Sequence, residues 1–315
     1  MQYYIKNWGK PPGFAARIQG WDEGRGRIVT RVEARPYVLL APALTTLALL
    51  MMAPIAFIVV YSFWLRLPEG LDVPAFQFGN WITFATDPFY WKALMSTFRF
   101  ALITTVVCIL LGYPTAYFLA RAQVANRGLL LFLIFLPFWI SFIIRTLAWI
   151  NVLGKNGFIN AMLMGAGLID EPFKMLYNDF SVIMGLTYFQ LPYMIINVYV
   201  CLDGIDHNLD PAARTLGCTP WQAFREVTLP LSLPGLGAGS LLCFVLAAGS
   251  YVTPRLLGGP DTLFFPDLIY EAIISQLDWP FGAVLSVVML IALGIVIAVY
   301  NRFMSLSDLY RSLAR

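Results

Sequence analysis

Five polar side chains interrupt apolar stretches of this sequence at positions where they could bind a solute or a neighbouring helix. Gln190, Tyr193 and Asn197 recur at i, i+3 and i+7, so they share one face of a helix. Ser250 and Tyr251 stand near the end of another apolar stretch. The chemistry open to these groups is hydrogen bonding, either to other helices or to a molecule in a pore between them. Both interpretations stay open, and the five residues are candidates for lining a translocation pathway.

Arg145 adds a positive charge inside a third apolar stretch. If that stretch is a helix that begins near Leu129, Arg145 lies ~24 Å along it, close to the outer face of a membrane. The guanidinium could snorkel to that interface or bind a neighbouring carbonyl group. Alternatively, it lines the outer mouth of the same pathway.

The residue types needed for metal binding or catalysis are scarce. His207 is the only histidine, and the cysteines are scattered, so a transition-metal site has too few ligands. We find no glycine-rich phosphate loop and no cluster of nucleophile and base. We therefore expect no catalytic residue, no metal and no cofactor in this chain, and no disulfide among its four cysteines: Cys108, Cys201, Cys218 and Cys243.

The composition predicts an all-α integral membrane protein. Hydrophobic residues make up 59% of the 315 residues and charged residues 12%, about half the charged share of a soluble domain. A bilayer core of ~30 Å needs roughly 20 apolar residues in a helix. Six stretches qualify, and their prolines would kink a helix without excluding it from a membrane. The predicted spans are Tyr37–Leu65, Phe100–Ala120, Leu129–Val152, Ser181–Leu202, Gly235–Pro254 and Phe281–Phe303.

Two further apolar stretches are too short to span. Residues 158–169 are predicted to form a surface helix, and residues 267–277 a short amphipathic helix. None of the six spans contains Asp or Glu, although proton-coupled transporters usually carry such acids inside the membrane. The sequence therefore disfavours an autonomous secondary transporter, and the energy source is expected to be another chain.

Basic residues outside the spans predict the topology, since cytoplasmic segments carry the excess of Lys and Arg. Fourteen fall on one side and six on the other, which places both termini and the loop 203–230 in the cytoplasm. We expect a basic cytoplasmic segment at 1–36 with no cleaved signal peptide, a membrane domain at 37–304 and a cytoplasmic tail at 305–315. The net charge of +3, with basic residues beside the spans, predicts contact with lipid and no nucleic-acid binding.

The loop 203–230 is predicted to form two short helices joined by a glycine bend. Leu209, Ala212, Ala213 and Leu216 lie on one face of the first helix, and Gly217 ends it. Asp206 or Asn208 can cap its start, and Pro211 is tolerated in its first turn. Thr219, Pro220 and Gln222 then form the start of a second helix, which Leu229-Pro230 is expected to end. Periodicity alone is equally consistent with an amphipathic loop lying on lipid headgroups.

The run Pro211-Ala-Ala-Arg-Thr-Leu-Gly217, followed by Leu229-Pro230, resembles the Glu-Ala-Ala loop signature of binding-protein-dependent ABC importer permeases. The resemblance implies that this loop forms coupling helices that dock into a cleft of an ATPase. Pro211 stands where the family has glutamate, and Asp210 precedes it, so an acidic group is kept one residue early. The residues implied in coupling are Asp210, Pro211, Ala212, Ala213, Arg214, Leu216 and Gly217.

The likeness covers most of the chain and is closest to the spermidine/putrescine-type permeases. It includes Leu136-Pro-Phe-Trp139, Arg145-Thr146 with Trp149, and Asp278-Trp-Pro-Phe-Gly282. It implies a six-helix type I permease fold in an inner membrane and import of a polyamine or a related amine or amino-acid-like compound. Arg145 is notable in this context, because a bare cation would make a poor binding site for a polyamine.

The implied partners are a homologous second permease chain, two ATPase subunits that use ATP and Mg, and an extracytoplasmic solute-binding protein. Two functions of other classes serve as alternatives. A membrane-embedded enzyme would need the catalytic cluster that we do not find. A channel would conduct without ATP, and the coupling-loop pattern disfavours it.

Overall fold

The computed structural model describes residues 35–121 and 126–303, and these residues are mostly helical. The predicted basic segment 1–36 lies almost wholly outside this range, and the predicted tail 305–315 lies entirely outside it. The chain divides into two units at residues 57 and 58. The first described helix lies mostly in the first unit and is described by itself.

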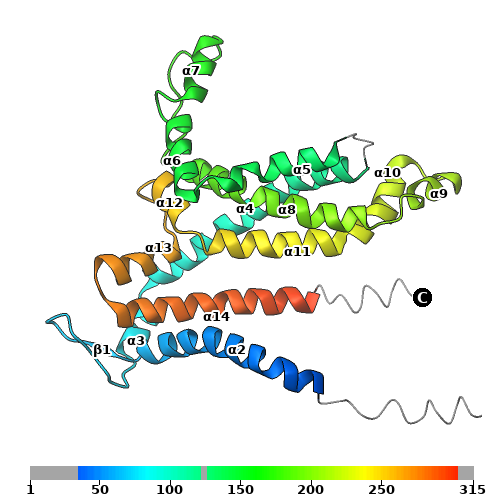
Figure 1. The fold of residues 1–315 in the computed structure, drawn as a ribbon. Coiled ribbons are helices and arrows are strands. Elements are labelled where there is room, and N and C mark those ends of the chain that lie inside the picture. The colour runs from blue at the N-terminus through cyan, green and yellow to red at the C-terminus, as the bar shows by residue number, and fades with distance from the viewer. Residues whose placement is uncertain (1–34, 122–125, 304–315) are drawn as a thin grey trace, which may run out of the picture. The chain divides into compact units, whose positions relative to one another are not determined.

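The elements follow one another from the first helix to the last as labelled in Figure 1. The first unit and the region just after it contain α2 (Arg35–Tyr61), a hairpin of β1 (Leu65–Arg66) and β2 (Asp72–Val73), and α3 (Gly79–Thr86). Next come α4 (Pro88–Arg121), α5 (Arg127–Phe135), the 3₁₀-helix η1 (Leu136–Trp139), α6 (Phe142–Leu153), α7 (Phe158–Gly165) and α8 (Asp179–Asp203). The remaining elements are α9 (Leu209–Thr215), α10 (Pro220–Ala223), the π-helical η2 (Phe224–Thr228), α11 (Leu229–Ala248), α12 (Val252–Leu257), α13 (Phe265–Tyr270), the π-helical η3 (Glu271–Ser275) and α14 (Trp279–Phe303).

Within the described ranges, five helices are long and apolar enough to cross a membrane, and a bent pair supplies a sixth if it counts as one span. The five lie at Leu40–Tyr61, Pro88–Arg121, Asp179–Asp203, Pro220–Ala248 and Trp279–Arg302. The predicted multi-span helical fold is therefore confirmed. The spans predicted to start at Ser181 and Phe281 match α8 and α14 closely, whereas α4 begins twelve residues before the predicted Phe100.

The predicted third span, Leu129–Val152, is wrong as a continuous helix. The segment is a pair of helices bent by 93°, with the break at Ile140 and Ser141. Pro137 has no N–H to donate to the preceding turn, and the backbone at Ile140 and Ser141 is extended. Because the chain changes direction here, α6 does not continue the axis of α5, and Arg145 does not lie on that axis.

The predicted fifth span, Gly235–Pro254, is displaced toward the C-terminus. One helix runs from Pro220 to Ala248, and Gly249 to Tyr251 separate it from α12. Leu229-Pro230 does not end the preceding helix, because the π-helical turn η2 leads into α11 and the Leu229 N–H donates to the Phe224 carbonyl. The short surface helices are present, as α7 and as the continuous run of α13 and η3.

The helices α4, α8 and α11 pack side by side as the central bundle of the second unit (Figure 1). Glycines let them approach closely: a Cβ at Gly112 of α4 or at Gly239 of α11 would meet Met194 of α8. Gly185 in the same way lets α8 approach Thr253 and Leu257 of α12. Small residues at such contacts are typical of helix packing inside membranes.

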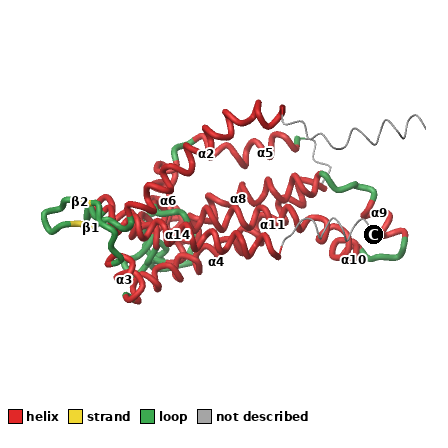
Figure 2. Tube along the Cα trace, turned by 90° about the horizontal axis from the view of Figure 1, so that it is seen from below, coloured by secondary structure: helices red, strands yellow, loops and turns green. Residues whose placement is uncertain are grey.

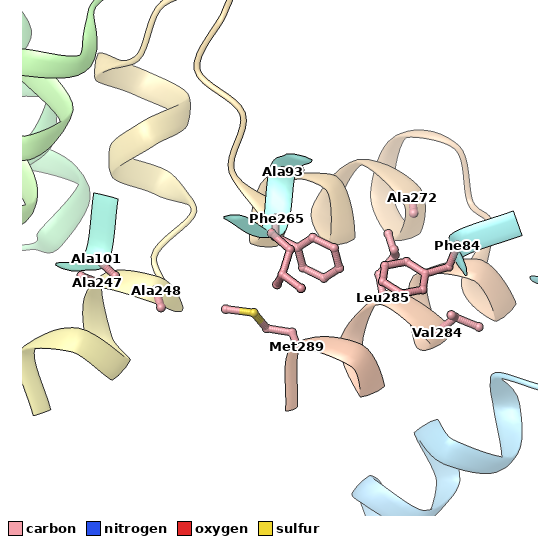
Figure 3. Packing of buried hydrophobic residues seen from close by; sticks show 11 residues of the cluster. Phe84, Ala93, Ala101, Ala247, Ala248, Phe265, Ala272, Val284, Leu285 and Met289 are labelled. Atoms are coloured by element: carbon pink, nitrogen blue, oxygen red, sulfur yellow. The ribbon is translucent and has the colours of Figure 1, made fainter. Parts of the chain in front are cut away.

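A second cluster of buried side chains joins α14 and α13 to α3 and to the start of α4. Figure 3 shows Phe265 beside Leu285 and Phe84, and the rings of Phe84 and Phe265 meet edge to face at 6.2 Å. The Phe265 N–H donates to Thr97 Oγ1 at 2.8 Å, which fixes the start of α13 on α4. Figure 2 shows the β-hairpin and α3 at one end of the bundle and α9 with α10 at the other.

We predict that Gly235→Ala destabilises the central bundle by about 1–3 kcal/mol, the usual cost of overpacking. A Cβ at Gly235 would meet the Cys201 side chain and would lie 2.7 Å from the Asn197 carbonyl oxygen of α8. The matched control is Gly294→Ala in α14, where a Cβ has nothing within 4 Å. The melting temperatures of the two purified variants are compared with that of the unmodified protein. Equal melting temperatures for both variants would contradict the close packing of α8 on α11.

Candidate functional site

A cavity of about 620 Å³ opens between α6, α8 and the end of α11. All the residues proposed for the pathway except Asn197 line it. The lining residues are Phe138, Ser141, Phe142, Ile143, Arg145, Leu186, Phe189, Gln190, Tyr193, Leu246, Gly249, Ser250, Tyr251 and Val252. The structure thus brings together side chains from three separate stretches of the sequence.

The cavity lies near the middle of the α8 helix. Phe189 and Gln190 lie ~15 Å from the start of α8 at Asp179, and the helix has 25 residues. Arg145 contacts Phe189, so it also lies at this level. The prediction that Arg145 lies close to the outer face assumed one straight helix from Leu129, and the chain instead bends by 93° after η1, so the ~24 Å counted along that helix does not apply.

Arg145 is buried, with 9% of its surface exposed. Its guanidinium carbon lies 4.9 Å from the ring centroid of Phe138 and 4.8 Å from that of Phe189. These are cation–π distances, which partly offset the loss of hydration. Nε and Nη1 of the guanidinium have no hydrogen-bond partner among the residues that the structure describes. The charge is therefore shielded by aromatic rings but not neutralised.

Gln190 is 3% exposed and serves helix packing as well as the cavity wall. With its amide oriented to satisfy both groups, its oxygen accepts from the Ala247 N–H at 3.1 Å and its nitrogen donates to the Leu186 carbonyl. Tyr193 packs edge to face on Phe138 at 5.2 Å. Asn197 donates to the Tyr193 carbonyl at 2.8 Å. Of the three polar residues on this face of α8, Gln190 and Tyr193 thus line the cavity, whereas Asn197 binds the backbone of its own helix.

A row of contacts leads from the cavity to the surface of α13. Tyr251 stacks on Tyr270 with ring centroids 5.3 Å apart, and the Arg255 guanidinium lies 4.5 Å from the Tyr270 centroid. Arg255 also donates to Asp267 at 2.7 Å, and this hydrogen bond raises the pKa of Arg255 above its ordinary value. A movement of α13 would therefore reach Tyr251 in the cavity wall.

The first helix of the loop 203–230 begins at Leu209, which directly follows Asn208, one of the two predicted cap positions. Asp206 accepts from the Asn208 N–H at 2.9 Å, and the structure shows no side-chain cap by Asn208. Gly217 ends the helix with a φ of 96°, a left-handed conformation that favours glycine. The Cys218 N–H donates to the Ala213 carbonyl at 3.1 Å, a hydrogen bond typical of glycine-terminated helices.

The second helix of the loop has the predicted capping box. Thr219 Oγ1 accepts from the Gln222 N–H at 3.3 Å, and Gln222 Oε1 accepts from the Thr219 N–H at 2.8 Å. Gly217 therefore ends the first helix, and the capping box of Thr219 and Gln222 starts the second, which together fix the bend between the two helices.

The residues of the apolar face predicted for α9 do not all point the same way: one packs inside this chain and another is exposed at its surface. Ala213 is buried within this chain with 9% exposure, whereas Leu216 is 87% exposed. Ala212 and Gly217 are also exposed. Leu216 and its exposed neighbours form the part of this helix that is available to another protein.

Asp210 faces inward. Its carboxylate accepts from Thr228 Oγ1 at 2.7 Å and lies 3.8 Å from Nε of Arg121, at the end of α4. The side chains of Asp210 and Arg121 are only 18% and 12% exposed. The acidic group next to Pro211 thus ties α9 to α4 and to the π-helical turn η2, and it positions the loop from within the chain.

The partners of these charged groups were not predicted from the sequence. Arg121 and Thr228 are distant from Asp210 in sequence, and Phe138, Phe142 and Phe189 resemble ordinary lipid-facing aromatic residues. The unusual density of aromatic residues near Pro137 and Arg145 was the available signal. In the described part of the chain, no three His, Cys, Asp or Glu side chains form a group that could hold a metal ion.

Comparison with known proteins gives one family and several relatives. The family model described as the binding-protein-dependent transport system inner membrane component matches residues 109–308. The spermidine/putrescine transport system permease protein PotB of Escherichia coli K12 is 36% identical over 256 residues, covering 81% of this chain and 93% of PotB. PotB of Haemophilus influenzae is 36% identical over 216 residues, covering 69% of this chain and 76% of that protein.

Two solved structures share the fold at low sequence identity. A chain of the bacterial alginate ABC transporter, crystallised with an alginate pentasaccharide-bound periplasmic protein, aligns with a TM-score of 0.66 at 17% identity, covering 84% of this chain and 92% of that one. A chain of the inward-facing MetNI methionine ABC transporter aligns with a TM-score of 0.53 at 17% identity, covering 68% and 94%. These likenesses support the expected type I permease fold.

We predict that Asp210→Ala lowers the free energy of local unfolding of α9 by about 1–3 kcal/mol. The substitution leaves the Thr228 hydroxyl without its acceptor and Arg121 without its nearest carboxylate. Hydrogen exchange at the backbone amides of 206–219 should become roughly tenfold faster or more. Glu226→Gln is the control, since Glu226 is exposed in the same region. Unchanged exchange in the Asp210 variant would show that the loop does not depend on this carboxylate.

Proposed function

This chain belongs to the family of binding-protein-dependent transport system inner membrane components, and on that premise we propose that its cavity is part of a solute pathway driven by the loop 203–230. The chain is a permease subunit of an ABC importer. We infer that it forms one half of the pathway and contributes no catalysis of its own, since a separate ATPase binds ATP and Mg.

The observation that carries the proposal is the link between the exposed loop and the cavity. α8 and α11 both lead into the loop, and both line the cavity, through Gln190 on α8 and Leu246 on α11. Leu216 is exposed and directly follows α9, which lies at the end of the bundle opposite the β-hairpin (Figure 2). A force applied to α9 and α10 would therefore be transmitted along packed helices to the cavity walls, as a rigid-body change of access requires.

The partners follow from this arrangement. Two ATPase chains would dock at the exposed surface around Leu216 and at its equivalent on a second permease chain, which we propose is homologous but different. An external solute-binding protein would meet the other end of the bundle, where α13 and the β-hairpin lie. At that end this chain carries acidic side chains that are exposed or half-exposed, among them Asp261, Asp267 and Glu271.

The solute is proposed to be a small amine or an amino-acid-like compound. The relatives with the highest identity quoted above are named for spermidine and putrescine. The cavity, at about 620 Å³, has room for a small amine. Its aromatic residues offer π faces to an ammonium group: Phe138, Phe142, Phe189, Tyr193 and Tyr251.

The test of the importer function is the ATPase activity of the complete complex in lipid. The binding protein is added empty or loaded with one member of a panel of polyamines, amino acids and opines. Stimulation of hydrolysis by one loaded form supports the proposal. Solute flux without ATP would instead indicate a channel, and a chemical change in the solute would indicate an enzyme.

We predict that Leu216→Asp abolishes coupling, with solute-stimulated ATP hydrolysis falling at least about tenfold while membrane insertion and pairing with the second permease remain. A charge at this exposed apolar position would have to be desolvated against the ATPase. Gly217→Val should act similarly, because a β-branched residue resists the positive φ at a cost on the order of 1 kcal/mol or more.

The control for Leu216→Asp is Leu216→Met, which keeps an apolar side chain of similar volume at the same exposed position. Ala213→Glu is a less direct probe, since Ala213 is buried within this chain. Normal stimulated hydrolysis in both loop variants would mean that the loop is only a connector at the membrane surface.

We predict that both termini and the loop 203–230 are cytoplasmic, because basic residues favour that side fourteen to six. Single cysteines are placed at Asn208 or Asn156 in a background without Cys108, Cys201, Cys218 and Cys243, and intact cells are treated with an impermeant thiol reagent. Labelling is expected at Asn156 and not at Asn208. The reverse pattern would invert the topology.

A further inference from the structure

We propose that Arg255 is a positioning residue, which transmits contact of the solute-binding protein with α13 to the cavity wall at Tyr251. The inference rests on the proposed import function and deepens it, because it names a route by which the outer end of the bundle acts on the cavity. Tyr251 lines the cavity, and Arg255 follows it by about one helical turn, on α12.

Tyr251 and Arg255 contact the same ring of α13. The two residues are four apart, and the Arg255 N–H donates to the Tyr251 carbonyl at 3.1 Å, so they share one face at the start of α12. The Tyr270 ring stacks on Tyr251, with centroids 5.3 Å apart and planes 16° from parallel. The Arg255 guanidinium carbon lies 4.5 Å from the Tyr270 centroid. A displacement of the Tyr270 ring therefore acts on two side chains of α12.

Asp267 holds Arg255 in this position. Its carboxylate accepts from Arg255 at 2.7 Å, and it precedes Tyr270 by three residues on the same helix, α13. Arg255 thus has one contact with a charge and one with an aromatic face, both from α13. The paired side chains of Arg255 and Asp267 are 43% and 29% exposed. Ion pairs this accessible add little to stability, so this one is better suited to fix the position of one helix on another.

The two helices that these contacts join are anchored on different parts of the bundle. α12 is attached to α8, because Ser181 Oγ donates to the carbonyl of the buried Leu257 at 2.7 Å. α13 is attached to α4 through the hydrogen bond from the Phe265 N–H to Thr97. A shift of α13 relative to α8 therefore strains the contacts between α12 and α13, and the start of α12 lies in the cavity wall.

Tyr270 adjoins the outer surface of the bundle. It is followed directly by the π-helical turn η3, in which Glu271 is exposed and Ile274 is 54% exposed. π-helical turns are frequent at functional sites. Figure 1 shows α13 at the end of the bundle away from α9 and α10. A protein that docks on η3 from this side presses on the helix that carries Tyr270, and Arg255 passes the displacement to Tyr251.

The experiment separates transmission from docking. The complete complex, with both permeases and the ATPase, is placed in lipid nanodiscs, and ATP hydrolysis is measured against the concentration of binding protein. The binding protein is loaded with putrescine or, if another member of the panel stimulates the unmodified complex more, with that compound. The maximal rate divided by the rate without binding protein measures transmission, and the half-saturating concentration measures docking.

Arg255→Gln should lower the maximal stimulation about fivefold or more, the lower end of typical coupling between sites, and leave the half-saturating concentration unchanged. Arg255→Lys keeps the charge for Asp267 and should lower the stimulation less. Tyr270→Leu should act like Arg255→Gln, whereas Tyr270→Phe keeps the ring and should be stimulated normally. The melting temperature of the Arg255→Gln complex should be unchanged, because the ion pair is partly exposed.

Arg99→Gln is the matched control. Arg99 donates to Asp179 at 2.9 Å and its guanidinium carbon lies 5.0 Å from the Phe100 ring centroid, so it makes the same two kinds of contact as Arg255. Arg99 and Asp179 join α4 to α8 and lie outside the lining of the cavity. This variant should keep the full stimulation.

A direct readout of the cavity wall uses Ser250→Cys, next to Tyr251, in a chain without its four native cysteines. The rate of reaction with a small thiol reagent is measured with and without the loaded binding protein. The binding protein should change this rate when Arg255 is present and should leave it unchanged in Arg255→Gln.

Three results would overturn the proposal. In the first, Arg255→Gln is stimulated like the unmodified complex. In the second, it raises only the half-saturating concentration, which would place Arg255 in the docking surface. In the third, Arg99→Gln loses as much stimulation, which would indicate a general loss of activity. Failure of the importer function itself would be seen separately, as an unmodified complex whose hydrolysis no loaded binding protein stimulates.

Discussion

Lipid tails neither donate nor accept hydrogen bonds, so each peptide group in a membrane span must find its partner within the protein or in a water-filled cavity. Two breaks in the helices of this chain conform to that constraint. The backbone opens at Ile140 and Ser141, and again from Gly249 to Tyr251. Ser141, Gly249, Ser250 and Tyr251 all line the same cavity. The irregular backbone and the space for a solute therefore occur together, since neither is tolerated against lipid.

Two helices connect the cavity to the loop 203–230, and one of them, α11, ends at the second break. α8 and α11 meet at Gly235 and Gly239, where the absence of side chains lets the two backbones approach. A contact of this kind transmits displacement well, because it leaves little room for one helix to move without the other. The π-helical turn η2 continues the α11 helix into the loop, and Thr228 in that turn binds Asp210 of α9.

Much of this arrangement could be predicted from the sequence, because the signals were local. Apolar length gave α8 and α14, and the capping residues Thr219 and Gln222 gave the start of α10. The bend after Pro137 could not be sized, since proline in a membrane helix is compatible with a slight kink as well as a 93° turn. The pairing of Asp210 with Arg121 and the packing of Arg145 between Phe138 and Phe189 depend on contacts between distant segments. Periodicity within one segment carries no information about these contacts.

Asp210 and Arg145, two charged side chains of the described residues that face inward, differ in a way that their positions explain. Asp210 lies at the end of the bundle, where its carboxylate accepts a hydrogen bond from Thr228 and lies near the Arg121 guanidinium of the same chain. Arg145 lies at the middle of the bundle with aromatic rings on its faces and with two nitrogens that lack acceptors. A satisfied charge holds a loop in one position, because moving the loop would break its hydrogen bonds. An unsatisfied charge favours whichever state brings it an anion, so a ligand that binds it in one conformation and not in the other shifts the balance between the two. Asp210 is therefore suited to keep the loop in one position, whereas Arg145 is held by aromatic rings that leave its Nε and Nη1 without an acceptor among the described residues.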